Sequence, residues 1–393
     1  MKPLSKASSI DVVATGIGLH TALGPTAAAT WKNLMAGKSA IASRQPFLDL
    51  APSPLAMAGK QPLALAAITR AVVQAAWEDA GLNCVQPQGN SLSLETSCGV
   101  VVGSSRSYLH KWETMAIAQR QGAFEGNWLE ALPNGPALMA ARLVGSSGPV
   151  LAPMAACATG VWAIAQAADL IRNGQCDRVV AGAVESPITP LTLAGFGKMG
   201  ALAQTGCYPF DRNREGFVLG EGGAMLVLES AVLAKARGAK VYGRILAAGM
   251  TNDSHHLSSF EPSYAMGRRA VEHCLQRSKL MPTDIDAVHM HGTSTAQNDQ
   301  MEASLVGELL GRQVRVMASK GATGHTLGAS GALSTALGLL SLQRQEVLPC
   351  VGLRSPDFSL NFVRQGQAAR VKNLLCLSFG FGGQNAALAL AQE

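Results

Sequence analysis

The chain has 393 residues, of which 48% are hydrophobic and 15% charged. This composition predicts a large buried core in one large domain or two ordinary ones. Aromatic residues make up only 5% of the chain, which argues against an all-β sandwich and against an aromatic platform that stacks nucleic-acid bases. The formal charge of +6 is spread thinly along the chain, so it suits an acidic protein partner better than a DNA groove.

Cysteine spacing and the N-terminus indicate the compartment. Eight cysteines are scattered with no CxxC pair and no Cys/His spacing of a metal site, as expected of small buried side chains in a reducing cytosol. The N-terminal segment has no apolar signal core, and no uninterrupted apolar window of eighteen residues occurs. The sequence therefore predicts a cytoplasmic protein that neither spans a membrane nor binds nucleic acid.

Short β-rich runs alternate with Ala- and Leu-rich stretches of helical length. The first part of the chain contains DVVATGIG, CGVVVGSS, GPVLAPMAA, DRVVAGAVE and GGAMLVLES. The pattern then begins again with VYGRILAAGM, DAVHMHGTST, VRVMASKGATGH, VLPCVG and LLCLSFGFGG. Strands that alternate with helices predict a layered α/β fold, and the restart predicts two related halves, residues 1–239 and 240–393.

In each half the third strand runs into a turn followed by an Ala/Gly-rich helix. These turns are AACATG and KGATGHTLGASG. A duplicated unit brings both turns to a pseudo-twofold axis, with both helix N-termini facing one cavity. Chance similarity between two α/β units of like composition is the alternative.

Cys157 lies in the first of these turns, where a helix N-terminus favours the nucleophilic thiolate. A packed core cysteine is the alternative at such a position. His325 lies in the second turn, five residues after Lys320, and His291 lies in the run AVHMHGTST, where a strand is expected to end. His289 and His291 also have the spacing of a packed pair or of metal ligands, but no third ligand lies nearby in sequence. One cysteine and two histidines at converging turns suit thioester chemistry followed by carbanion formation.

Seven ordered motifs identify a family. They are VVATGIGLHTALG with WKNLMAGKSAI, LPNGPALMAARLVGSSGPV, ACATG, YPFDRNREGFVLGEGGAMLVLE, HGTSTAQND, KGATGHTLGASG and SFGFGGQN. Along essentially its whole length the chain resembles the elongating β-ketoacyl-acyl-carrier-protein synthases of the thiolase superfamily. The resemblance implies a thiolase-like layered αβαβα fold made of two duplicated halves.

The same resemblance implies roles for individual residues. Cys157 is expected to accept the acyl group, His291 and His325 to serve decarboxylation and condensation, and Lys320 to be a supporting charge beside His325. The backbone N–H groups of Cys157 and Phe381 are expected to form the oxyanion hole. Thr293 and Thr295 are expected to hydrogen-bond the phosphopantetheine arm. Phe196 and Phe381 are expected to lie beside the acyl chain.

The resemblance also implies the partners of the chain. A homodimer is expected to use acyl and malonyl thioesters carried by an acyl carrier protein, with no metal and no cofactor beyond the phosphopantetheine arm on the substrate. Carrier proteins are strongly acidic, so Lys60, Arg70, Arg120 and Arg142 are candidates for the docking surface. Each of these four is equally consistent with a solvated surface charge.

Two positions depart from the family pattern. Ser334 stands nine residues after His325, where the family usually has a Glu tied to the lysine, and Asp299 or Glu302 is the hypothesised replacement charge. Trp112, in GSSRSYLHKWET, falls near the residue that limits chain length. Its indole is predicted either to fill the acyl tunnel or to pack at a dimer interface.

Other functions remain as alternatives. A non-catalytic partner subunit that resembles chain-length factors is disfavoured by Cys157, because those subunits usually lack the nucleophile. An acyltransferase or decarboxylase that does not condense keeps the same fold and is consistent with Ser334 and Trp112. The motifs are shared by synthases of fatty acids, of polyketides and of other specialised acyl chains, so they do not choose among these pathways.

Overall fold

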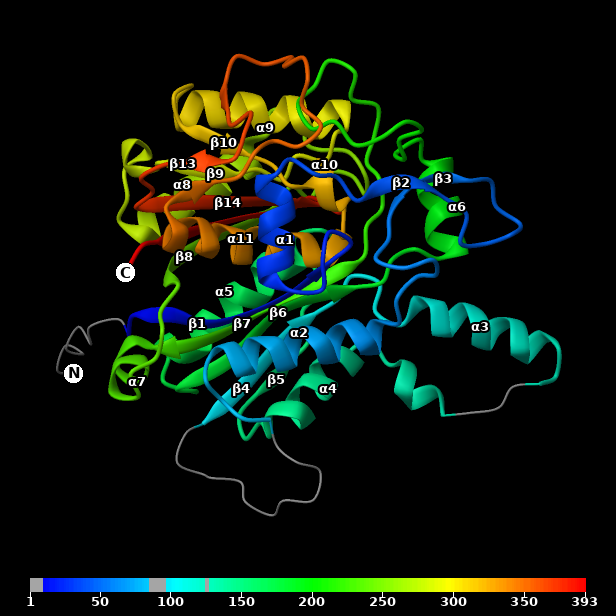
Figure 1. Ribbon diagram of the computed structural model, residues 1–393, viewed down its shortest axis with the longest axis horizontal. Helices are drawn as coiled ribbons and strands as arrows, with labels where there is room; N and C mark the ends of the chain where they lie inside the picture. Colours follow the sequence, from blue (N-terminus) through cyan, green and yellow to red (C-terminus); the bar gives the residue numbers. More distant parts are fainter. Residues whose placement is uncertain (1–9, 85–96, 124–126) are drawn as a thin grey trace.

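The computed structural model describes residues 10–84, 97–123 and 127–393 (Figure 1). Its main sheet has eleven strands in the order β12-β10-β9-β14-β15-β8-β1-β7-β6-β4-β5. The strands from the first part of the chain are β1 (Val12–Thr21), β4 (Cys98–Gly103), β5 (Val150–Leu151), β6 (Arg178–Glu185) and β7 (Gly222–Ser230). The others are β8 (Gly243–Asn252), β9 (Ala287–His289), β10 (Arg315–Met317), β12 (Asn361–Phe362), β14 (Asn373–Gly380) and β15 (Gln384–Ala391).

The two halves of this sheet repeat one topology. In the first half the strand order is β5-β4-β6-β7-β1, and in the second it is β10-β9-β14-β15-β8, which is the same order when each half is numbered along the chain. Corresponding neighbours also run the same way: β4 is parallel to β6, and β9 to β14, whereas β1 and β8 are antiparallel to their neighbours. The halves meet through a short antiparallel contact between β1 and β8. The predicted duplication is confirmed.

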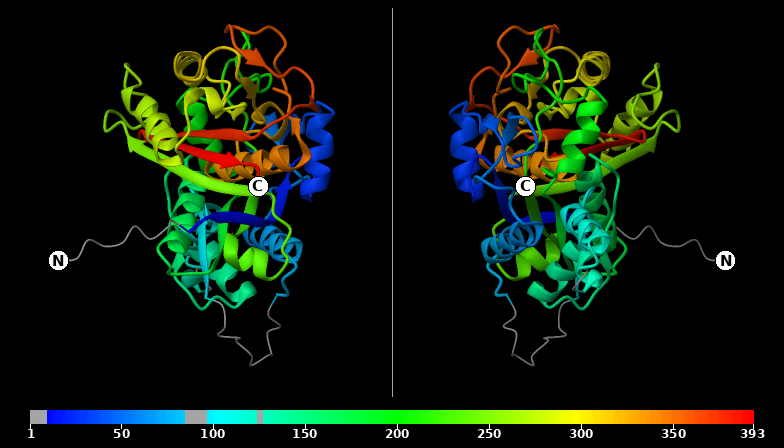
Figure 2. Two further views of the ribbon diagram at one scale, coloured as in Figure 1. Left: turned by 90° about the vertical axis from the view of Figure 1, so that its left-hand side faces the viewer. Right: turned by 90° about the vertical axis from the view of Figure 1, so that its right-hand side faces the viewer.

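Helices form three layers around these half-sheets (Figures 1 and 2). In the middle, α5 (Thr159–Arg172) and α11 (Ser330–Arg344) pack on each other and on strands of both halves. On the outside, α2 (Leu65–Asp79) and α4 (Gly135–Val144) cover the first half, while α8 (Ala265–Ser278) covers β8 and β15 and contacts α9 (Ala296–Leu309). This is the predicted αβαβα layering.

The middle layer is close-packed because glycines face each other across it. A Cβ atom on Gly160 of α5 would lie 2.2 Å from the backbone nitrogen of Ala332 on α11. A Cβ on Gly331 would lie 2.8 Å from the nitrogen of Val161. Only glycine allows backbones to approach this closely, so these positions set the distance between the two half-sheets.

Shorter elements complete the chain. They are α1 (Ala27–Met35), α3 (Leu109–Arg120), α6 (Pro190–Lys198), α7 (Ala231–Ala236), α10 (Lys320–Thr323), and the two-stranded pairs β2 (Ile41–Arg44) with β3 (Ser53–Ala56) and β11 (Glu346–Val347) with β13 (Gln367–Ala368). The expected strand VLPCVG forms only the short β11 outside the main sheet, because its backbone then turns away. Residue 239, where the sequence divides the chain, lies in the loop between α7 and β8, and the division into two domains stays a prediction. Among the helices of the described residues, none is both long and apolar enough to cross a membrane.

Candidate active site

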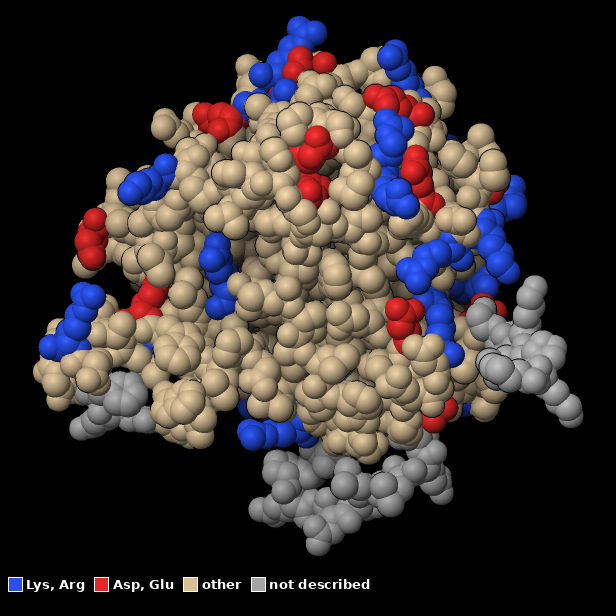
Figure 3. Space-filling model, turned by 180° about the vertical axis from the view of Figure 1, so that it is seen from behind, with Lys and Arg blue, Asp and Glu red and all other residues tan. Residues whose placement is uncertain are grey.

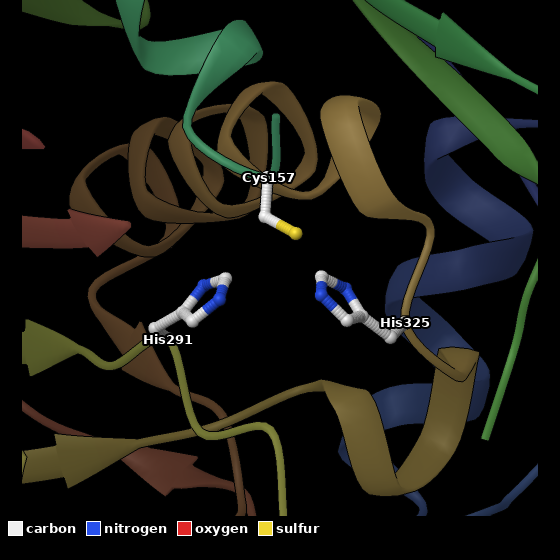
Figure 4. Close-up of side chains that lie close together, drawn as sticks. All are labelled: Cys157, His291 and His325. Carbon is white, nitrogen blue, oxygen red and sulfur yellow. The ribbon is translucent and has the colours of Figure 1, made fainter. Parts of the chain in front are cut away.

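A cavity of about 350 Å³ opens between the two halves, and Cys157, His291 and His325 lie at its base. One ligand-type atom from each of these three buried side chains lies within 4.8 Å of the others. Figure 4 shows the thiol and both imidazoles pointing toward one another. The sequence placed the three residues in separate turns, and the fold brings them together.

The turn that carries Cys157 is held by local hydrogen bonds. Ala156 adopts a left-handed conformation with φ of 45°, which projects the next residue into the cavity. The Thr159 hydroxyl donates to the Ala156 carbonyl (2.6 Å) and accepts from the Ala155 N–H (2.9 Å). Because α5 begins at Thr159, Cys157 lies at a helix N-terminus, as the sequence predicts.

The environment of Cys157 keeps its sulfur protonated. Burial raises the pKa of this thiol to about 11, although the charges of Lys320 and Arg106 and the N–H of Phe381 act in the opposite direction. The sequence-based expectation that the helix N-terminus favours the thiolate therefore does not describe the resting site, because loss of water outweighs these favourable contributions.

Phe381, which directly follows β14, lies close to Cys157. The Ser378 hydroxyl donates to the Cys157 carbonyl (2.9 Å), and a Cβ on Gly380 would lie 3.0 Å from the Cys157 nitrogen. The Phe381 ring stacks on Phe196 of α6, with centroids 5.9 Å apart. Phe381 lines the cavity, and Phe196 belongs to the buried apolar cluster that includes Cys157. The oxyanion-hole role of Phe381 and the acyl-pocket role of both residues stay predictions.

The backbone around His291 is fixed by a buried carboxylate. Glu302 on α9 accepts the N–H groups of His291 and Gly292, each at 2.6 Å. Gly292 has φ of 50°, and the pair of bonds holds this left-handed turn. Asp299, one turn earlier on α9, accepts the N–H of Phe210 at 2.7 Å. Both acids are thus bound to backbone N–H groups.

Lys320 is the charged group of the site. Its ammonium contacts the His291 carbonyl and lies 3.3 Å from the His291 Nδ1 atom. The sequence expected Lys320 beside His325; the hydrogen-bond contacts are with His291, and His325 receives its influence through charge. Burial lowers the Lys320 pKa to about 8, and the carboxylate of Glu302 opposes this shift.

The two imidazoles are neutral, and their hydrogen-bond partners allow both to carry the proton on Nε2. Burial and the positive charge of Lys320 hold the pKa of both His291 and His325 well below the usual range. The Lys320 ammonium has no acceptor, so the His291 Nδ1 atom beside it must accept, and the proton lies on Nε2. The Ser330 hydroxyl lies 2.9 Å from the His325 Nδ1 atom and allows the same tautomer. With ring centroids 5.3 Å apart, the pair offers two N–H donors to one cavity.

Thr293 and Thr295 line the cavity toward solvent, and their hydroxyls lie 2.9 Å apart. Thr295 also caps α9 through the Asn298 N–H. Hydroxyls that line a cavity suit the amides of a pantetheine arm, and this role of the two residues stays a prediction. Ser334 lies buried on α11, whose partner strand is β14. Whether Glu302 or Asp299 replaces the missing family Glu stays a hypothesis; their negative charges raise the Lys320 pKa.

The structure does not bring Trp112 to this cavity. It lies on α3, its side chain is 41% exposed, and its indole N–H donates to the Ala131 carbonyl at 2.9 Å. Arg106 instead lies close to the acyl side of the site, with its guanidinium carbon 5.1 Å from the centroid of the Phe196 ring. The sequence analysis missed Arg106, although a basic residue directly after a buried strand and a Gly-Ser-Ser turn was the available signal.

The cluster also has the composition of a metal site. Thiolate and imidazole are ligands that zinc accepts, and the three donor atoms are close enough to share one ion. His289, which the sequence paired with His291 as a possible ligand, is not part of this cluster. It is fully buried on β9, and neither ring nitrogen has a hydrogen-bond partner within residues 10–84, 97–123 and 127–393.

Family models match most of the chain. Residues 51–234 match the model of the β-ketoacyl synthase N-terminal domain, and residues 242–354 match that of the C-terminal domain. Curated relatives named 3-oxoacyl-[acyl-carrier-protein] synthase 2 include one from Mycobacterium bovis, 32% identical over 97% of both chains. Another, from Mycobacterium leprae, is 32% identical over 96% of both chains.

Solved structures agree with the fold. A type II PKS ketosynthase, in complex with its acyl-carrier protein and bound to the hexaketide, superposes with a TM-score of 0.90 at 24% identity, covering 98% of this chain and 100% of that one. A β-ketoacyl synthase from Burkholderia phymatum superposes with a TM-score of 0.85 at 26% identity, with the same coverage. The predicted thiolase-like fold is thereby confirmed.

Proposed function

This chain belongs to the β-ketoacyl synthase family, and we propose that it extends an acyl group held on Cys157 by decarboxylative condensation with a malonyl thioester. Its class is acyltransferase, specifically 3-oxoacyl-[acyl-carrier-protein] synthase, in fatty acid or polyketide biosynthesis. The observation that carries the proposal is the convergence of one thiol and two neutral imidazoles within 4.8 Å of each other.

The first step loads the enzyme. Cys157 transfers its proton as its sulfur attacks the thioester carbonyl, the new C–S bond forms, and the donor C–S bond breaks. The departing thiolate takes up a proton and leaves as the carrier thiol. The N–H groups of Cys157 and Phe381 stabilise the oxyanion that develops in this step. We propose that the proton of the Cys157 thiol passes to the departing carrier sulfur, because both imidazoles already carry a proton on Nε2 and their low pKa makes them poor acceptors.

The second step forms the carbon–carbon bond. The malonyl carboxylate leaves as carbon dioxide, and the bonding electrons become an enolate whose oxygen accepts hydrogen bonds from His291 and His325. The enolate carbon then attacks the acyl-Cys157 carbonyl, the C–S bond breaks, and the Cys157 sulfur recovers a proton. Two neutral N–H donors suit this step because they stabilise the enolate without protonating its carbon. Lys320 supports it by orienting His291.

The partners follow from the same chemistry. We propose that acyl carrier proteins deliver both thioesters, that Thr293 and Thr295 bind the phosphopantetheine amides, and that no resident metal or cofactor is used. Lys60, Arg70, Arg120 and Arg142 are all exposed and remain candidates for the docking surface. All eight cysteines are free, in keeping with the proposed cytoplasmic location.

We also propose a homodimer. Strand β5 is the last strand of the main sheet, and Val150 and Leu151 on it are each 37% exposed. Met154, which follows them, is 59% exposed. The face seen from behind has charged side chains mainly around its rim and few at its centre (Figure 3). A short apolar edge strand suits pairing with the same strand of a second copy.

Intact-protein mass spectrometry tests the proposal. The protein is incubated with acyl-carrier proteins bearing two to sixteen carbons, and malonyl-carrier protein is then added. Wild type should gain an acyl adduct that Cys157→Ala lacks, and the adduct should be consumed with release of a β-ketoacyl product. Absence of any adduct would favour a partner subunit that does not catalyse. Loss of carbon dioxide without a β-ketoacyl product would favour the decarboxylase alternative, which Ser334 keeps open.

A further inference from the structure

Arg106 places a positive charge beside the proposed acyl pocket. It follows β4, and its guanidinium carbon lies 5.1 Å from the centroid of the buried Phe196 ring. Phe196 in turn stacks on Phe381 and belongs to the apolar cluster that contains Cys157. The Arg106 charge also lowers the pKa of the Cys157 thiol, so the two groups interact electrostatically. A cation in this position is unexpected where only alkyl chains are to be bound.

The turn that carries Arg106 is rigid. The N–H groups of Ser105 and Arg106 both donate to one carboxylate oxygen of Glu185, the latter at 3.2 Å. The Ser107 N–H donates to the Ser104 hydroxyl at 2.8 Å, and Ser107 has φ of 46°. These bonds fix the backbone, so Arg106 is held in place by the fold and not by its own side-chain contacts.

The guanidinium itself is free to bind a ligand. Arg106 is exposed, and its guanidinium makes no ion pair or hydrogen bond with the residues that the structure describes. Glu185 interacts with its charge, but this acid already accepts two backbone N–H groups, and burial raises its pKa to about 7. A planar cation stacked on an aromatic ring, with its N–H groups unused, is a preorganised site for a carboxylate.

A second cavity adjoins this turn. It has a volume of about 440 Å³ and is lined in part by Leu63, Ser107, Tyr108, His110, Lys111 and Ile188. Ile188 belongs to the same apolar cluster as Cys157, and Ser107 directly follows Arg106. The walls are largely apolar, and the described residues that line the cavity include the basic Lys111 and His110 but no Asp or Glu.

We propose that Arg106 selects acyl groups that carry a carboxylate at or near the end remote from the thioester. This inference rests on the proposed function and names its substrate class. A carboxylate accepts two parallel hydrogen bonds from the guanidinium, whereas an alkyl end displaces water from that charge and returns no hydrogen bond. Charge-assisted hydrogen bonds of this kind correspond to a preference of roughly tenfold to a hundredfold.

The test measures the rate at which Cys157 is acylated, by intact mass, using pantetheine thioesters so that carrier-protein docking plays no part. Adipoyl is compared with hexanoyl, and glutaryl with pentanoyl, so each pair differs only in the terminal carboxylate. Wild type is expected to load each carboxyacyl donor at least about tenfold faster than its alkyl partner. Arg106→Met should load both donors of a pair at equal rates or load the alkyl donor faster, and Arg106→Lys should show a preference between those of Arg106→Met and wild type.

Lys198→Met is the matched control, because it removes one exposed positive charge from α6, the helix that carries Phe196. It should keep the wild-type ratio, and thermal melting should show all variants folded. Equal ratios in wild type and Arg106→Met would overturn the inference while leaving the proposed function intact. If no donor of either kind acylates Cys157 although iodoacetamide alkylates it, the inference is overturned, and the separate panel of acyl-carrier proteins decides the proposed function.

Discussion

At the scale of single residues, charge balance around Lys320 governs the site. Both imidazoles stay neutral because burial, together with the positive charge of Lys320, lowers their pKa. Lys320 stays protonated near neutral pH because Glu302 offsets part of the cost of burial. Glu302 has a pKa of about 7, so it is ionised when Lys320 begins to lose its proton near pH 8. The buried acid and the buried base are therefore linked.

Glu302→Gln is expected to narrow the pH range of condensation. Removing the negative charge lowers the Lys320 pKa below about 8, so Lys320 loses its proton at lower pH and the alkaline limb of kcat/KM moves down by about one unit. Glu308→Gln makes the same chemical change at the exposed side of α9 and should leave the profile unmoved. If Glu302→Gln, alone and combined with Asp299→Asn, leaves both the alkaline limb of kcat/KM and the condensation rate unchanged, the hypothesis that these acids replace the usual family Glu is refuted.

His289 is expected to weaken the fold in acid. Burial lowers its pKa to about 3, whereas an unfolded chain has histidine near 6.5. Below pH 6.5 the unfolded state therefore takes up a proton that the folded state does not, so the free energy of unfolding falls as pH falls. In urea unfolding, the free energy of unfolding of His289→Leu minus that of wild type should rise by about 1.4 kcal/mol for each unit by which the pH falls from 6 to 4. A difference that does not change with pH would contradict this; exposed His255→Leu is the control.

At the scale of elements, the contact between α5 and α11 holds in register the two turns that precede these helices and carry Cys157 and His325. Gly160→Ala would place a methyl group 2.2 Å from the Ala332 nitrogen, so the helices must separate. Such overpacking costs about 1–3 kcal/mol in the free energy of unfolding, and we expect slower Cys157 acylation as well. Gly195→Ala, in exposed helix with no atom within 4 Å of the new Cβ, should be neutral or slightly stabilising. Equal thermal stability of the two variants would contradict the argument.

Most strands of the main sheet could be predicted because they carry runs of β-branched residues, as in β4 and β6. Strand β15 (Gln384–Ala391) was missed, since its sequence QNAALALA favours a helix and only its place between β14 and β8 makes it a strand. The same limit applies to the acyl pocket. Cys157, His291 and His325 stand in recognisable motifs. The position of Arg106 depends instead on hydrogen bonds from the N–H groups of Ser105 and Arg106 to Glu185, which lies 80 and 79 positions further along the chain.

At the scale of the molecule, duplication explains why the site lies between the halves. Strands β5 and β10 are equivalent in the two half-sheets, and each runs into a turn ahead of a central helix, α5 or α11. Cys157 comes from the first of these turns and His325 from the second, while His291 follows the neighbouring strand β9. Neither half holds the complete cluster, so the proposed chemistry requires both.

The free edge at β5 has a consequence for assembly. Leu151 is exposed there beside Val150, and pairing with a second β5 would join two sheets across a twofold axis and bury both side chains. Leu151→Lys puts a charge into that interface, so light scattering should give a dimer for wild type and a single chain for the variant. Val232→Lys, at an apolar residue of α7 that is 78% exposed, makes the same change away from β5 and should stay dimeric. A wild type that is a monomer at micromolar concentration, or a Leu151→Lys variant that stays dimeric, would place any interface elsewhere and leave Val150 and Leu151 as ordinary surface residues.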